Sequence, residues 1–231
     1  MSDLDVGAIV WSKGDPDRPL VLLLHGFGSN ERDLAGLTPA LPSEYRYAAL
    51  RGPLALPVPL APGFEPGYAW FSILANGAAM VTSGARGAAR VLADWAEHSG
   101  LAPVGAIGFS QGGALALELL REAQLPLQWA AAIAGWVLDT EDAANAADTA
   151  DAARGDDPRD HTLAQRRPPV FWGRGVEDTV IPSELVERTR AWLPAHTEPT
   201  IREYPSLAHA VSADELTELS NWMRARLTAN D

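Results

Sequence analysis

A chain of 231 residues with 47% hydrophobic side chains is long enough to bury one substantial core, so we expect a single domain spanning residues 1–231. Its formal net charge of −12 disfavours binding to nucleic-acid phosphates or to anionic lipid surfaces. The absence of cysteine excludes disulfides, cysteine metal sites and a cysteine nucleophile.

Apolar runs bounded by glycine or proline alternate with stretches of helical periodicity along most of the chain. In chain order, the sequence predicts an edge strand at 8–12, strands at 18–28 and 45–53 around a helix at 31–41, a proline-rich surface loop at 53–69 and a helix at 87–98. Further strands are predicted at 103–110, 129–137, 168–175 and 200–205, with helices at 111–123 and 184–193. A last helix starts near Ser212, where Ser212 and Glu215 have the spacing of a capping box.

This alternation predicts an α/β fold with a mostly parallel central sheet and helices on both of its faces. In such sheets, binding sites form beyond the carboxyl ends of the strands. One segment interrupts the alternation, because residues 139–167 are rich in alanine and aspartate. This acidic insertion is either a solvated loop or a mobile lid over a cleft, and the sequence leaves both alternatives open.

The segment Gly108-Phe109-Ser110-Gln111-Gly112 has the form Gly-x-Ser-x-Gly and joins a predicted strand to a predicted helix. That context is typical of a nucleophile elbow. Glycines flank the serine because side chains at those positions would collide in so tight a turn. The following helix directs its positive N-terminal end toward Ser110. The alternative is structural: the glycines form a turn, and the serine only caps the helix.

A serine hydroxyl needs a base to take its proton and an acid to orient that base. In this architecture the acid and then the histidine follow the serine along the chain. Glu177 and Asp178 follow the strand at 168–175, and His209 follows the strand at 200–205. Among five histidines, His209 alone satisfies both the order and the position. The residues by themselves leave Glu177 and Asp178 as alternatives for the acid.

The oxyanion that forms when a serine attacks a carbonyl needs backbone N–H donors. One donor is expected from Gln111, the residue after the serine, and a second from the loop His25-Gly26-Phe27-Gly28 behind the first buried strand. Glycines in that loop let the backbone turn its N–H groups inward. The alternative is a tight strand exit without any binding role.

The motifs LLLHGFGSNERDL, RGP, AWF, GFSQGGALAL, EDTVIP and AHAVSADEL occur in this order between about Leu20 and Leu227. In these segments the chain resembles the phospholipase/carboxylesterase family of α/β-hydrolases, which includes acyl-protein thioesterases and small bacterial carboxylesterases. The resemblance implies an α/β-hydrolase fold. It also implies Ser110 as the nucleophile, Asp178 as the acid and His209 as the base.

The same resemblance implies that the N–H groups of Phe27 and Gln111 form the oxyanion hole. It implies a substrate channel near Trp70, Phe71 and Ile181.

We therefore expect a serine hydrolase that cleaves carboxylic esters with short- to medium-chain acyl groups through an acyl-enzyme intermediate. An acyl thioesterase or a lysophospholipase would use the same residues, and a non-catalytic ligand-binding receptor on this fold is an alternative of another class. The chain departs from the family's pattern at Ala208, where a glycine often precedes the histidine, and in the long insertion 139–167. Both departures leave the shape of the acyl pocket open.

Neither a signal peptide nor a membrane-spanning segment is visible in the sequence. The first residues carry no basic stretch followed by an apolar run, and no apolar segment is long enough to cross a bilayer. No pair of histidines has the spacing of metal ligands. We expect a cytoplasmic monomer or homodimer that acts on a small-molecule ester, without a cofactor, a metal, a nucleic-acid partner or stable membrane association.

Overall fold

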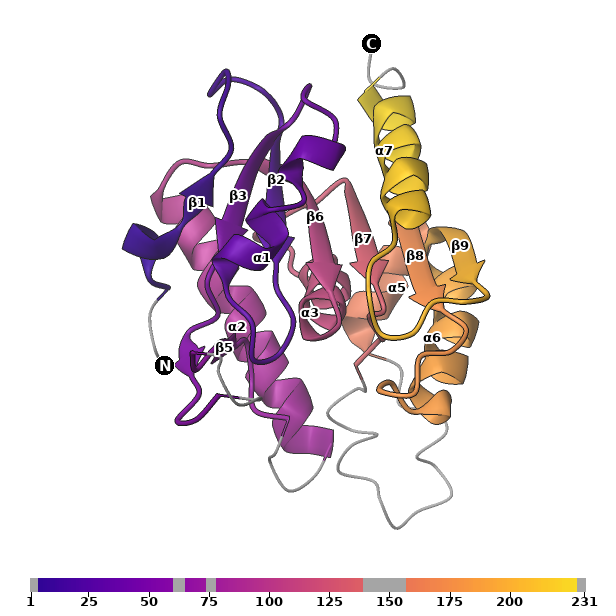
Figure 1. Cartoon of the computed structure of the whole chain (residues 1–231). Coiled ribbons are helices and arrows are strands. Elements are labelled where there is room, and N and C mark those ends of the chain that lie inside the picture. Colours follow the sequence, from indigo (N-terminus) through magenta and orange to yellow (C-terminus); the bar gives the residue numbers. More distant parts are fainter. Residues whose placement is uncertain (1–3, 60–64, 74–77, 139–156, 228–231) are drawn as a thin grey trace.

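The computed structural model describes residues 4–59, 65–73, 78–138 and 157–227, and its main element is a seven-stranded sheet (Figure 1). The strands of this sheet are β1 (Val10–Trp11), β2 (Leu20–Leu24), β3 (Arg46–Leu50), β6 (Pro103–Phe109), β7 (Trp129–Ile133), β8 (Pro169–Gly175) and β9 (Glu198–Tyr204). Their spatial order is β1-β3-β2-β6-β7-β8-β9. Strand β1 is antiparallel to β3, and all other neighbouring strands are parallel.

Helices cover both faces of the sheet. They are α1 (Glu31–Ala35), α2 (Ala78–His98), α3 (Gln111–Leu119), α5 (Pro158–Arg166), α6 (Ser183–His196) and α7 (Ala213–Leu227). The side chains of strand β2 pack against both helix layers, because successive side chains of a strand point to opposite faces of the sheet. Leu22 packs in one apolar cluster with residues of α2, α3 and α6, whereas Leu23 packs in a second cluster with residues of α1 and α7. Helices α1 and α7 both lie on the near face of the sheet in Figure 1. The predicted α/β fold is confirmed.

Each strand and helix predicted within the described residues is present, and three regions contain more structure than expected. The predicted loop at 53–69 contains a short antiparallel pair, β4 (Leu54–Ala55) and β5 (Tyr68–Ala69). Helix α2 begins well before residue 87. The end of the predicted acidic insertion forms α5, because the Asp157 carboxylate accepts a hydrogen bond from the N–H of Arg159 and caps that helix. Residues 139–156 of the insertion lie outside the described residues.

A buried cluster of charged side chains holds α5 against α3 and α6. The Arg121 guanidinium, from the end of α3, lies 2.8 Å from the Glu118 carboxylate and 2.7 Å from the Asp160 carboxylate of α5. Asp160 also accepts a hydrogen bond from the indole N–H of Trp192 on α6. Removing one partner of such a cluster leaves a buried charge uncompensated, so the cluster fixes the relative positions of these helices.

The start of α7 differs from the expected capping box. The Ser212 hydroxyl accepts a hydrogen bond from the N–H of Glu215, as a cap should. The Glu215 side chain, however, turns into the core, where it is 0% exposed and packs so closely on β8 that a Cβ at Gly173 would clash with its carboxyl group. Neither Glu215 oxygen has a hydrogen-bond partner among the described residues. Burial raises the pKa of Glu215 to about 7, because the charged form is poorly solvated there.

Because the Glu215 carboxyl group is buried, we expect its contribution to the free energy of unfolding to fall as the pH rises. Below pH 4.5 Glu215 is protonated in both states, and between pH 4.5 and about 7 it ionises in the unfolded chain but not in the folded one. At about 1.4 kcal/mol per pH unit, this lowers the free energy of unfolding by about 3 kcal/mol across that interval. The difference in unfolding free energy between wild type and Glu215→Gln, measured in urea from pH 4 to 8, should therefore change by that amount.

The exposed control Glu187→Gln on α6 should keep the wild-type pH profile. Parallel profiles for wild type and Glu215→Gln would contradict a buried protonated carboxyl group.

Candidate active site

Ser110 lies at the end of β6 where the chain turns sharply into α3. Its φ of 53° is in the left-handed region, which non-glycine residues rarely adopt. The turn is held by close backbone contacts: a Cβ at Gly108 would clash with the carbonyl of Gly112, and a Cβ at Gly112 would clash with the carbonyl of Leu24 in β2. The Ser110 side chain makes no capping hydrogen bond to α3. Ser110 therefore does not act as a side-chain cap of α3, which was the structural alternative.

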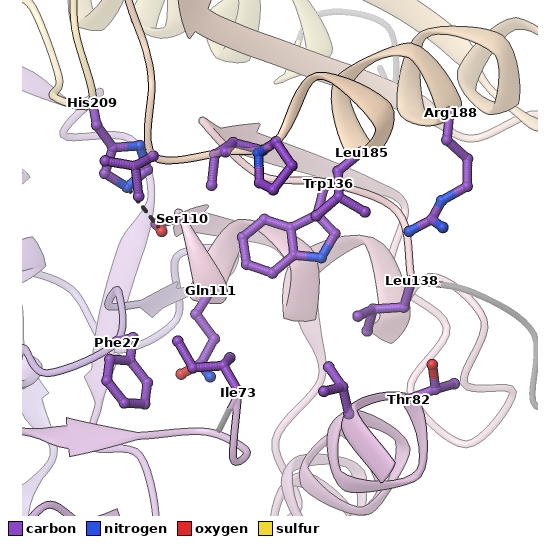
Figure 2. A pocket seen from close by; sticks show the side chains of 14 residues that line it. Phe27, Ile73, Thr82, Ser110, Gln111, Trp136, Leu138, Leu185, Arg188 and His209 are labelled. Atoms are coloured by element: carbon purple, nitrogen blue, oxygen red, sulfur yellow. Dashed lines mark hydrogen bonds between the residues drawn. The ribbon is translucent and has the colours of Figure 1, made fainter. Parts of the chain in front are cut away.

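The Ser110 hydroxyl instead begins a chain of hydrogen bonds that joins three loops. Its Oγ lies 3.0 Å from Nε2 of His209, and Nδ1 of His209 lies 2.8 Å from Oδ2 of Asp178 (Figure 2 shows the first contact). These loops follow β6, β9 and β8, so all three groups meet at the carboxyl ends of parallel strands, as predicted. The His209 ring also packs on Phe109, with centroids 4.9 Å apart, which restricts its rotation.

Asp178 occupies a buried position with three donors around its carboxylate. Besides His209, the N–H groups of Val180 and Ile181 donate to Oδ1 at 2.9 and 3.2 Å. Burial alone would raise the pKa of Asp178, but these hydrogen bonds favour the charged form and hold the pKa below its usual value. Glu177 is exposed to solvent. Of the two acids that the residues alone left open, the structure brings Asp178 to the histidine.

His25 is buried beneath the site and organises the loop after β2. The Gly52 N–H donates to its Nε2 at 2.9 Å, so Nδ1 carries the proton and donates to the Gly26 carbonyl at 2.7 Å. Burial lowers the pKa of His25, which keeps the ring neutral. With both ring nitrogens bonded to the backbone, His25 supports the loop that carries Phe27 and is not available as a base.

Phe27 and Gln111 line the same cavity as Ser110. Gln111 is the first residue of α3, where a helix leaves its N–H groups without intrahelical acceptors. Within the described part of the chain, no hydrogen-bond acceptor takes the N–H of either residue. These two N–H groups remain the candidate oxyanion donors.

Trp70 and Phe71 contact Gln111, a residue of the cavity wall, and are not among the described residues that line the cavity. Both are almost fully buried, at 2% and 1% exposed. The Trp70 N–H donates to the Gln111 side-chain oxygen at 2.9 Å, and the Gln111 side-chain amide donates to the Phe71 carbonyl at 2.7 Å. The Trp70 indole N–H also donates to the His25 carbonyl. Their role is to hold Gln111 and the His25 loop in place.

A cavity of about 590 Å³ opens beside Ser110 and is mostly apolar (Figure 2). Ile181 lines it, as expected. The described residues around it are Phe27, Ile73, Val81, Thr82, Ser110, Gln111, Trp136, Leu138, Val180, Ile181, Pro182, Leu185, Arg188 and His209. A cavity of this size and polarity suits a small ligand with an apolar chain.

Sequence reasoning did not identify the contributions of α2, α6 and the segment after β7 to this cavity. On α6, Leu185 and Arg188 are three residues apart and follow Pro182 at the same interval, so they share one helix face. That spacing was the available signal, but it does not reveal which face meets the site.

The described ranges contain no group of three histidine, cysteine, aspartate or glutamate side chains that could hold a metal ion. No helix in these ranges has the length and apolar character needed to span a bilayer.

The buried position of Gln111 predicts a structural role for its side chain. Replacing it in Gln111→Ala leaves the Trp70 N–H and the Phe71 carbonyl without their partners, and each buried unpaired group costs about 1–3 kcal/mol. Urea denaturation should show a loss of about 2–6 kcal/mol in unfolding free energy. The exposed control Gln165→Ala should change it by less than about 0.5 kcal/mol. Equal stability of the two variants would contradict this role.

Comparison with known proteins agrees with this fold. Residues 6–227 match the family model described as Phospholipase/Carboxylesterase. A probable carboxylesterase, SOBER1-like, from Arabidopsis thaliana is 27% identical over 127 residues, which are 53% of this chain and 42% of that protein. The chain thus spans less than half the length of this curated relative.

Solved structures extend the similarity over nearly the whole chain. The carboxylesterase of Bacillus cereus is 25% identical, with a TM-score of 0.68 over 94% of this chain and 93% of its own. Acyl-protein thioesterase 2 of Zea mays, 24% identical with a TM-score of 0.67, covers 95% of this chain and 98% of its own and shares the fold. Because the family model matches almost the entire sequence, the chain belongs to the phospholipase/carboxylesterase family.

Proposed function

We propose that this protein is a serine hydrolase that cleaves carboxylic esters with short- to medium-chain acyl groups. The observation that carries the proposal is the continuous hydrogen-bonded chain from Asp178 through His209 to Ser110, on the wall of an apolar cavity. Membership of the phospholipase/carboxylesterase family supports the same reaction class.

In the first half of the reaction, Ser110 Oγ attacks the ester carbonyl carbon while Nε2 of His209 takes its proton. Asp178 keeps Nδ1 of the ring protonated and stabilises the positive imidazolium that forms. The carbonyl oxygen becomes an oxyanion, and the N–H groups of Phe27 and Gln111 donate to it. Collapse of this intermediate breaks the ester bond, and His209 gives its proton to the leaving alcohol.

In the second half, a water molecule attacks the acyl-serine carbonyl and gives a proton to His209. The same two N–H groups stabilise the second oxyanion. Collapse then releases the carboxylic acid, and His209 returns the proton to Ser110. A thioester has the same carbonyl carbon, so acyl thioesters are the second substrate class to test.

Replacement of the nucleophile should abolish this activity. For Ser110→Ala, hydrolysis of p-nitrophenyl esters over a range of acyl lengths should fall by about 1000-fold or more in kcat, because no acyl-enzyme can form. The profile of the wild type over acyl length measures the usable depth of the cavity. If wild type and Ser110→Ala are equally inactive on these esters and on acyl thioesters, the non-catalytic receptor becomes the better interpretation.

The acid should act through the histidine. Asp178→Asn preserves the size of the side chain but favours the wrong ring tautomer of His209, so kcat should fall by about 1000- to 10,000-fold. The exposed Asp214→Asn, which makes the same chemical change on α7, should keep activity within about twofold, as surface changes usually have little effect. Near-normal turnover by Asp178→Asn would remove the aspartate from the mechanism.

A further inference from the structure

The wall of the candidate substrate cavity is mostly apolar, and most of its polar side chains have partners within the protein (Figure 2). Ser110 and His209 bond each other, and the Gln111 side chain bonds the backbone behind the site. Arg188 donates a hydrogen bond to a backbone carbonyl. The hydroxyl of Thr82 differs from these groups, because no described residue forms a hydrogen bond with it.

Thr82 lies in the first part of α2 and is almost fully buried, at 1% exposed. A helical threonine commonly bonds the carbonyl four residues before it. Thr189 on α6 and Thr217 on α7 do so at 2.7 and 2.9 Å. Thr82 makes no such bond within the described part of the chain, and in Figure 2 its oxygen points from α2 toward the side of the cavity where Leu138 lies. A buried hydroxyl without a partner is costly, so its place in this wall suits a ligand that bonds it.

Packing alone does not account for the Thr82 hydroxyl. The neighbouring Val81 lines the same cavity with an apolar side chain of nearly the same shape, so a valine would fill the volume at Thr82. Trp136 also lines the cavity, and its indole N–H, which can only donate, has no hydrogen bond to any described residue. The part of a ligand that lies against this wall should therefore carry a hydrogen-bond acceptor.

We propose that Thr82 determines specificity by donating a hydrogen bond to an uncharged oxygen in the acyl chain, so that the preferred substrates are esters of keto- or hydroxy-carboxylic acids. This inference rests on the proposed esterase function and specifies its substrate class. The ester carbonyl binds at Ser110, and the chain follows the apolar wall to Thr82, which lies away from Ser110 in Figure 2. An uncharged oxygen fits, because one hydroxyl cannot replace the hydration that a charged group loses on burial.

The test compares esters that differ by a single oxygen, in the intact protein. The plain substrate is the methyl alkanoate that wild type hydrolyses best. Its partners carry a ketone at successive carbons of the same chain, beginning beyond the carbons next to the ester, where a ketone would activate the carbonyl. Wild type should show a kcat/KM about 3- to 10-fold above the plain ester for one ketone position, which is the effect of one neutral hydrogen bond. The ester with a hydroxyl at that carbon should share the gain.

Substitution of Thr82 should remove this preference. In Thr82→Val the ratio of the keto value to the plain value should fall to about one, mainly through the KM of the keto ester, because the contact is remote from the reacting carbonyl. Thr82→Ser keeps the hydroxyl and should retain part of the preference. The matched control is Thr217→Val, which makes the same chemical change at an exposed position on α7 and should keep the wild-type ratio.

Denaturation in urea separates a ligand contact from a structural role. Because the Thr82 hydroxyl has no partner among the described residues, Thr82→Val should unfold at the wild-type urea midpoint or above it. Thr189→Val removes a hydroxyl that accepts from the Val137 N–H and donates to the Leu185 carbonyl, so this variant should unfold at a lower midpoint.

Four results would overturn the inference. Wild type that hydrolyses plain and keto esters equally at every ketone position has no oxygen site in this wall. A gain limited to hydroxy esters means that Thr82 does not donate. A wild-type ratio in Thr82→Val, or an equal loss on both esters with a lower urea midpoint, leaves Thr82 without a role in selection. Wild type without activity on any ester or thioester overturns the proposed function itself, whereas turnover of plain esters separates the two failures.

Discussion

The site depends on the close approach of the backbones of β2, β6 and α3. Gly108 and Gly112 lack side chains because their Cβ positions are occupied by main-chain carbonyls, including that of Leu24. This packing holds Ser110 at a positive φ that it would not adopt in a free chain, and the surrounding sheet compensates for the strain. The serine hydroxyl consequently points away from the helix it precedes and toward the loop that carries His209.

Two buried polar side chains hold the neighbouring loops in position through hydrogen bonds to their backbone. His25 binds the backbone of Gly26 and Gly52, and Gln111 binds the backbone of Trp70 and Phe71. Each satisfies main-chain groups that would otherwise be buried without partners, which is costly in the low dielectric of a protein interior. The loops that carry the proposed oxyanion donors are therefore held in position before substrate binds, and preorganised donors of this kind are the effective ones.

The candidate catalytic groups and most of the cavity wall come from different elements. The candidate catalytic groups come from loops at the carboxyl ends of β6, β8 and β9, which parallel pairing brings to one edge of the sheet. The cavity wall comes from α2, α6 and the segment after β7, which pack across that edge. The described side chains that line the cavity from these elements are mostly apolar.

The sequence by itself determined the alternating fold, the turn at Ser110 and the loop of His209, because glycine spacing, strand periodicity and chain order are local signals. The residues by themselves left Glu177 and Asp178 as alternatives, whereas the family resemblance implied Asp178 as the acid and placed Trp70 near the substrate channel. The tertiary structure brings Asp178 to His209, and it alone decided that Trp70 supports Gln111 and that Arg188 lines the cavity. The physical reason is that each of these outcomes depends on which helix face or loop packs against a distant strand, and no short pattern encodes that choice.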